Sequence, residues 1–205
     1  MRKSLFFMLA AIAVMSVSCG TARKTAEAEK AKIAEWKSEG YSLTGSMSTF
    51  TLQQALSSHN TKILSDNQRY IPVMGTSEGS RVTELSVSSW VAQNDAAIRY
   101  AQAAGSIVSG GIARKFSNLS EQGSKLVGAY TQKVSEYIIP LMKESFSLCR
   151  LNGSYYEVIS YFIIDEETAV TARERALRES IKETDLEFEL ASEIDNWVKE
   201  FVKVD

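Results

Sequence analysis

Apolar residues in the first part of the chain follow the periods of a strand, a helix and a second strand. Residues 41–46 alternate between apolar and polar side chains, which predicts an edge-type strand. Thr51 and Gln54 form a capping-box pattern that opens a helix. The apolar face of this helix holds Leu52, Ala55, Leu56, His59 and Ile63. Residues 70–75 predict another strand, and Pro72 places it at a sheet edge or at a strand start.

The middle of the chain predicts two more helices. Residues 82–87 fit either a strand or a first helical turn, and from Ser89 to residue 116 the helical spacing is clear. Its apolar stripe is rich in alanine: Trp90, Val91, Asn94, Ala97, Ile98, Ala101, Ala104, Ile107 and Val108. Glycines within 105–111 predict fraying or a kink there. Residues 116–124 read as a polar loop, and a second helix follows until Pro140 ends it.

A β-hairpin is predicted in the C-terminal half of the chain. Residues 142–150 alternate as a strand, and residues 155–164 are dense in aromatic and β-branched side chains. Between them, Asn152 and Gly153 form the dipeptide that most often marks a tight hairpin turn.

A long amphipathic helix is expected after the hairpin. Asp165 caps it, and two glutamates occupy its first turn. The apolar stripe continues to Phe201, so the helix would span roughly 35 residues, about 50 Å. We expect it to project, to bend, or to pack on a partner. The residues predicted to bind that partner are Ile181, Phe188, Ile194, Val198 and Phe201.

The first twenty residues have the layout of a secretory signal. Arg2 and Lys3 precede an apolar run from Leu5 to Val14, too short to span a bilayer comfortably. The run ends in Ser18-Cys19-Gly20, which resembles a bacterial lipoprotein signal, where the cysteine is acylated and becomes the N-terminus. Cys19 is therefore the predicted lipidation site. An ordinary cleaved signal and an uncleaved helix are the alternatives.

Together these patterns predict an α+β fold. A small antiparallel sheet with the C-terminal-half hairpin is packed by alanine-rich helices, and a long C-terminal helix follows. The predicted organisation is a lipoprotein signal peptide (1–18), a tether or helical linker (19–39), an α+β domain (40–165) and the amphipathic helix (166–205), which packs on the domain or projects from it.

Composition changes this picture by exclusion. The chain of 205 residues has 23 basic and 25 acidic residues, and cleavage before Cys19 would shift the net charge from −2 to −4. Such a surface argues against nucleic-acid binding. If Cys19 is acylated, Cys149 has no cysteine partner in the same chain, so it is expected to be buried or, less often, to form an intermolecular bridge.

Catalytic and metal-binding chemistry finds little support. His59 is the sole histidine, and its neighbours Ser57 and Ser58 do not face it on a helix. One histidine and one free cysteine cannot fill a tetrahedral zinc shell. The carboxylates concentrate on the C-terminal helix among basic residues, which indicates a solvated face. We therefore predict no catalytic residue, no metal and no cofactor.

One resemblance bears on function. An alanine-rich helix that begins at Trp90, a second helix, and a strand pair joined by Asn-Gly-Ser-Tyr-Tyr span residues 89–164. This segment resembles the LPP-twenty type of small bacterial outer-membrane lipoprotein, and it is also similar to the N-terminal domain of a flagellar assembly protein of the outer-membrane ring. The resemblance implies a helix on a small antiparallel sheet and an envelope protein of structural or unknown role.

The expected function is a non-enzymatic, lipid-anchored protein of the cell envelope with a structural or protein-interaction role. Its lipid would attach it to the outer membrane, because Gly20 and not aspartate follows Cys19; the leaflet it faces stays open. The expected partner is another envelope protein, or a second copy bound through the C-terminal helix. The alternative is a module for glycan or peptidoglycan, in which Tyr155, Tyr156, Tyr161 and Phe162 stack on sugars instead of packing in the core.

Overall fold

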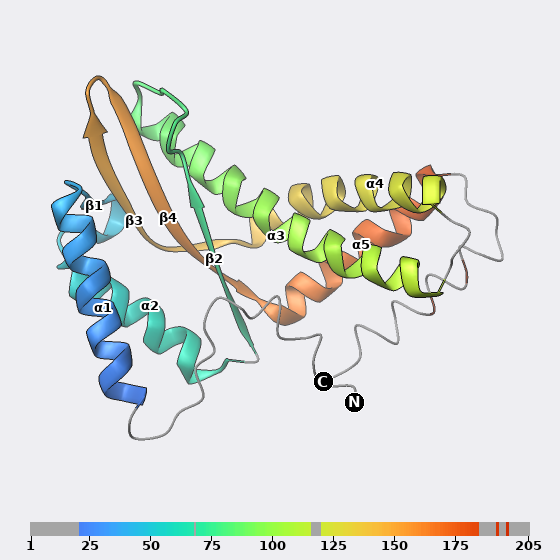
Figure 1. The fold of residues 1–205 in the computed structure, drawn as a ribbon, viewed down its shortest axis with the longest axis horizontal. Coiled ribbons are helices and arrows are strands. Elements are labelled where there is room, and N and C mark those ends of the chain that lie inside the picture. Colours follow the sequence, from blue (N-terminus) through green and yellow to red (C-terminus); the bar gives the residue numbers. More distant parts are fainter. Residues whose placement is uncertain (1–20, 68, 116–119, 185–191, 193–195, 197–205) are drawn as a thin grey trace.

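The computed structural model describes residues 21–67, 69–115, 120–184, 192 and 196 (Figure 1). Within them, helices surround one antiparallel sheet with the strand order β1-β3-β4-β2, so the predicted α+β class is confirmed. In chain order the elements are α1 (Thr21–Ser38), β1 (Ser42–Thr44), the 3₁₀ turn η2 (Gly45–Met47), α2 (Leu52–Ser65), β2 (Tyr70–Thr76), α3 (Leu85–Lys115), α4 (Ser120–Ile138), the 3₁₀ turn η3 (Ile139–Leu141), β3 (Lys143–Asn152), β4 (Tyr155–Asp165) and α5 (Glu166–Glu183).

The predicted hairpin is the centre of the sheet. β3 and β4 pair from Lys143↔Ile163 to Asn152↔Tyr155, so the loop between them consists of Gly153 and Ser154. Gly153 has a φ of +64° and Ser154 a negative φ, which fits a two-residue type II′ turn. β2 lies at one edge, as Pro72 predicted, and β1 lies at the other. β1 is shorter than the strand expected over 41–46, because the chain enters η2 at Gly45, whose φ is +68°.

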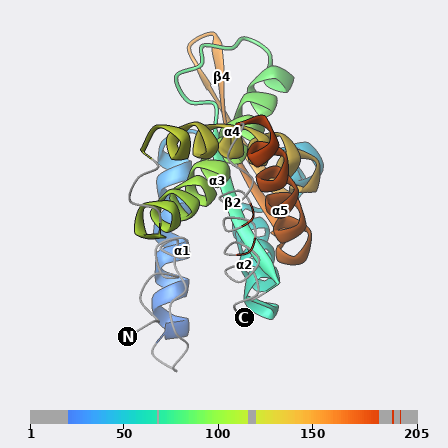
Figure 2. The same ribbon diagram turned by 90° about the vertical axis from the view of Figure 1, so that its right-hand side faces the viewer.

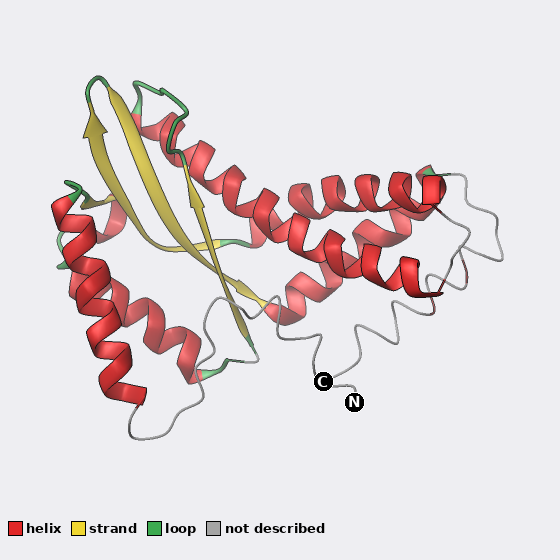
Figure 3. Ribbon diagram, in the orientation of Figure 1, coloured by secondary structure: helices red, strands yellow, loops and turns green. Residues whose placement is uncertain are grey.

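The sheet is covered on both faces, which makes three layers (Figure 3). Side chains alternate along β4, so neighbouring residues enter different cores. Tyr161 belongs to the cluster that α1 and α2 complete, whereas Phe162 and Ile164 belong to the cluster that α3 completes. This alternation places Tyr161 and Phe162, two of the four residues of the predicted sugar-stacking surface, on opposite faces of the sheet, and both are buried.

The layer of α1 and α2 is built on aromatic contacts. Trp36, at the end of α1, is 3% exposed and meets Phe146 and Tyr161 edge-on, while these two rings stack at 4.5 Å. The predicted capping box of α2 is present, and its expected apolar face is buried at Ala55, Leu56 and His59. The segment predicted as a linker therefore forms a helix whose last turns pack into the domain.

α3 lies close on the sheet because the contact is made by small residues. Ala92 and Ala96 are fully buried, and a Cβ on Gly75 would lie 2.0 Å from the carbonyl oxygen of Ala92. Residues 82–87, which fitted either a strand or a first helical turn, contribute to both sheet and helix. Val82 forms a β-bridge with Tyr156, and α3 begins at Leu85.

The second half of α3 leaves the sheet and forms a three-helix bundle with α4 and α5 (Figure 1). The helix does not fray at the glycines within 105–111, since α3 continues to Lys115. Gly105 is where α4 approaches, as a Cβ there would lie 2.3 Å from Thr131 Oγ1. The polar loop predicted over 116–124 is too long, because α4 already begins at Ser120.

The C-terminal helix begins where the sequence predicted. Asp165 is its N-cap, and α5 is described up to Glu183. Ile181 is half-buried and packs on the bundle core, so this residue of the expected partner-binding stripe serves the protein's own fold. Phe188, Ile194, Val198 and Phe201 lie outside the described residues. Arg173 ties α5 to α3, because its guanidinium donates to the Tyr100 hydroxyl, and Glu166 of the same helix pairs with it at 2.7 Å.

Candidate functional site

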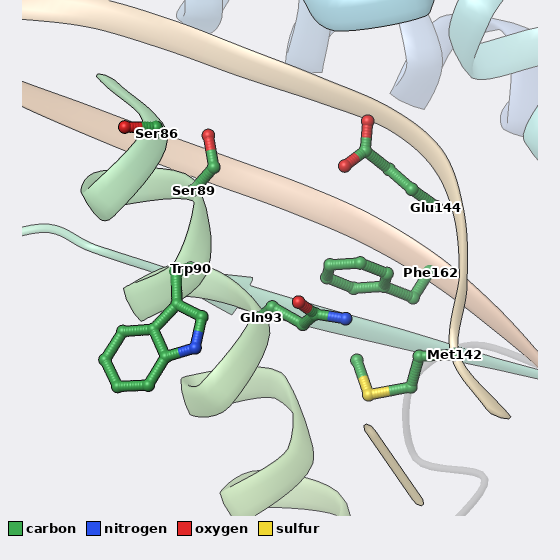
Figure 4. A pocket seen from close by; sticks show the side chains of 7 residues that line it. All are labelled: Ser86, Ser89, Trp90, Gln93, Met142, Glu144 and Phe162. Atoms are coloured by element: carbon green, nitrogen blue, oxygen red, sulfur yellow. The ribbon is translucent and has the colours of Figure 1, made fainter. Parts of the chain in front are cut away.

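A groove runs between the first half of α3 and the start of β3. It encloses about 280 Å³. Figure 4 shows four side chains from α3 on one side and residues of β3 and β4 on the other. The lining residues are Ser86, Ser89, Trp90, Gln93, Met142, Glu144 and Phe162. Phe162 and Met142 are buried and form the apolar floor, whereas hydroxyl, amide and carboxylate groups line the rim.

Trp90 is the most unusual residue of this site. Its side chain is 62% exposed, although α3 is packed on the sheet only a turn away through Ala92 and Ala96. Val87 and Ile98 are also exposed, at 40% and 47%. Residues 87, 90 and 98 fall on one side of a helix, so α3 carries an apolar stripe that faces away from the sheet.

The tip of the hairpin continues this apolar surface. Leu151 pairs with Tyr156, on the face of the hairpin that α3 covers, and is 62% exposed. The tip is fixed to the start of α3, because Ser88 Oγ donates to the carbonyl oxygen of Tyr156 at 2.9 Å. We call Val87, Trp90, Ile98 and Leu151 together the α3–hairpin surface.

A polar cluster on the other face of the sheet stiffens the hairpin. The Arg150 guanidinium contacts Glu157 at 2.6 Å and also reaches Glu39 and Glu78, both at 3.4 Å. Glu157 is 7% exposed, and a hydrogen bond from Asn152, together with Arg150, holds the pKa of its carboxyl below the usual range. The three carboxylates are therefore already satisfied by a cation, so this cluster is a structural brace for the hairpin.

The sequence-predicted residues do not assemble into a catalytic site. His59 is buried in a T-shaped arrangement against the stacked rings of Phe146 and Tyr161, at 5.7 and 5.6 Å, and its Nδ1 has no hydrogen-bond partner. Burial, with the nearby Lys32 ammonium as a smaller cause, lowers the pKa of His59 to about 4. Cys149 is half-buried and unpaired. Across the described residues, no group of three metal-ligating side chains is close enough to hold an ion.

The sequence does not mark this groove as a site: it places Trp90 in the apolar stripe of a helix, and it offers Phe162 only as a candidate for stacking on sugars. Trp90 and Ile98 belong to the predicted apolar stripe, and nothing in the sequence distinguishes these two exposed residues from the buried residues of the same stripe. Gln93, Met142 and Glu144 carried no signal, because they come from segments far apart in sequence. Only the packing of β3 beside α3 brings them together.

Comparisons with known proteins add no identification: no family model matches the chain, and neither a curated protein nor a solved structure is similar to it. Among the residues that the structure describes, none of the helices combines the length and the apolar character that crossing a bilayer requires.

Proposed function

We propose that this chain is a lipid-anchored, non-enzymatic protein of the bacterial cell envelope that binds another envelope protein. The anchor would be Cys19, acylated after cleavage of residues 1–18, and the site of residence would be the outer membrane. Support comes from the signal-like N-terminus and from the resemblance of residues 89–164 to LPP-twenty type lipoproteins. Acyl chains on Cys19 would give stable attachment, since two or more chains anchor a protein where one does not.

The observation that carries the interaction role is the α3–hairpin surface. Seven large apolar side chains are exposed within the described residues, and four of them belong to this surface. Of the other three, Phe50 and Leu64 are near opposite ends of α2, and Tyr155 lies on the opposite face of the hairpin. Single exposed apolar residues are ordinary, whereas a cluster of them, rimmed by polar groups, is typical of a protein-binding site.

The β2 edge of the sheet is an unfavourable place for a partner strand to bind. The backbone groups that face away from β4 belong to Tyr70, Pro72, Met74 and Thr76. Pro72 has no N–H. The Tyr70 N–H donates to the carbonyl oxygen of Asp66, and the Thr76 N–H donates to Asp95 Oδ2. One outward N–H is left in β2, so strand addition there would gain little.

The groove indicates how such a partner would be held. Its volume of about 280 Å³ is below the range typical of sites for drug-sized molecules, so it fits one or two side chains. The floor of Phe162 and Met142 favours an apolar side chain, and the Glu144 carboxylate at the rim favours a neighbouring cation. An envelope protein that presents an apolar residue beside a lysine or arginine meets both requirements.

Photocrosslinking in intact cells of the native host tests the proposal. A photoreactive amino acid at position 90 is expected to give an adduct with one defined envelope protein. The matched control is position 50, where Phe50 is also exposed and apolar but does not line the groove. Adducts only with a second copy of the chain, or equal adducts at both positions, would contradict binding of a foreign partner at this surface.

A glycan-binding module is the second candidate. The observation that favours it is the exposed Trp90 ring beside the hydroxyl and amide groups of Ser86, Ser89 and Gln93, a combination that suits sugars. A soluble peptidoglycan fragment that competes with the crosslink at position 90 would support this candidate. The absence of competition, together with a protein adduct, would remove it.

A further inference from the structure

The beginning of α1 and the end of α2 lie at one end of the molecule, opposite the hairpin tip. Figures 1 and 2 agree on this arrangement. The contacts between the two helices fix it, because the Glu29 carboxylate accepts hydrogen bonds from the side chains of Asn60 and Gln53, at 2.6 and 3.1 Å. We call the first turn of α1 and the last turn of α2 the basal end of the domain.

The predicted anchor is immediately next to this end. α1 begins at Thr21, and Gly20 is the single residue between Thr21 and Cys19. Two residue steps span at most about 7 Å. If Cys19 is acylated and held in the outer part of a lipid leaflet, the first turn of α1 must lie at the headgroups, because no linker separates it from the lipid.

The chemistry of the basal end suits a phospholipid surface. Leu64, in the last turn of α2, is 62% exposed, and the exposed Lys62 is in the same turn. Arg69, also exposed, follows α2 and pairs with Asp165 at 3.0 Å. The first turn of α1 has no acidic residue. An apolar side chain among cations is favoured at the boundary between headgroups and acyl chains.

We propose that the basal end rests on an anionic lipid surface, with Leu64 inserted among the headgroups and α1 standing away from the membrane. This inference rests on the proposed function, since it requires the acyl anchor. Because the beginning of α1 and the end of α2 would both lie at the lipid, the two helices would run away from it.

The orientation has a consequence for the partner site. α1 contains 18 residues and is therefore about 27 Å long. Glu39 follows its end and contacts Arg150, two residues before the last residue of β3. The hairpin tip is thus held about 30 Å above the lipid by α1. The α3–hairpin surface would be presented to proteins away from the membrane, and would not face the bilayer that holds the anchor.

Depth measurements on the acylated full-length protein test this orientation. Leu64→Cys and Phe50→Cys provide a matched pair, since both residues are exposed and apolar and they lie near opposite ends of α2. Each is made with Cys149→Ser, so that the new thiol takes the fluorescent label alone. The labelled proteins are placed in phosphatidylethanolamine vesicles that contain phosphatidylglycerol, with and without lipids brominated near the headgroup.

We expect bromolipid to quench the label at position 64 several-fold more than the label at position 50. Equal quenching, or stronger quenching at position 50, in a protein that carries its acyl mass and floats with the vesicles would overturn the orientation and leave the anchor standing. A protein purified from its native host with no acyl mass and no flotation would instead contradict the proposed function, and this inference with it.

Discussion

Replacing His59 by phenylalanine should remove most of the acid sensitivity of the fold between neutral pH and about pH 4.5. The imidazole is 5% exposed and lies edge-on to Phe146 and Tyr161, and Lys32 is the cation nearby. Phenylalanine keeps a flat ring in this place and cannot be protonated. It also removes Nδ1, which is buried without a partner.

The magnitude follows from the difference between two pKa values of the same histidine. In the unfolded chain the pKa is the ordinary 6.5, and in the folded protein burial lowers it to about 4. Between these values the unfolded state binds the proton more strongly, so stability is present in full above about pH 6.5 and falls as the pH is lowered toward 4. The loss at about pH 4.5 is about 2 to 3 kcal/mol, a large share of the stability of a typical domain.

Urea unfolding of the chain without residues 1–18, at about pH 7.5 and about pH 4.5, measures this loss directly. The native protein should lose about 2 to 3 kcal/mol more than His59→Phe. Because the chain has a single histidine, one NMR titration of its ring signal gives the folded pKa independently. Equal acid losses in both proteins, or a folded pKa near 6.5, would refute the reasoning.

Three further predictions concern packing and the groove. Gly75→Ala should destabilise the fold by about 3 kcal/mol, because the new Cβ would meet the backbone of α3. Gly128→Ala, in open space within α4, should instead stabilise the fold by up to about 1 kcal/mol. Thermal unfolding of the two variants measures both effects. Ser147 and Ser160 share a buried hydrogen bond of 2.8 Å, so alanine at either position should lower the free energy of unfolding by about 1 to 2 kcal/mol. The double variant should lose less than the sum of the two single losses, which a double-mutant cycle in urea measures. Trp90→Ser should change the free energy of unfolding by less than about 1 kcal/mol, yet abolish partner recovery from detergent-solubilised envelopes.

The elements that the sequence predicted well are those fixed by neighbouring residues. The turn after Asn152, the capping box of Thr51 and Gln54, and the cap at Asp165 each depend on side chains a few positions apart, and each is present. The turn residues still differ by one from the Asn-Gly step. Asn152 is the last residue of β3, and its amide donates to Glu157.

The features that could not be predicted depend on contacts between distant segments. Periodicity shows that Trp90, Ala97 and Ile98 lie within one apolar stripe, but it does not show where α4 stops covering α3. Ala97 is buried, whereas Trp90 and Ile98 are exposed. Likewise, the burial of His59 requires the ring of Phe146 from a strand some ninety residues later, and no local pattern records that contact.

The central claim is that Cys19 carries the lipid that places this domain in the envelope. Intact-protein mass spectrometry on the chain purified from its native host tests it most directly. The account predicts a chain that starts at residue 19 and bears acyl mass on that cysteine. A chain that starts at Met1, or one that starts near residue 19 without acyl mass, would contradict it.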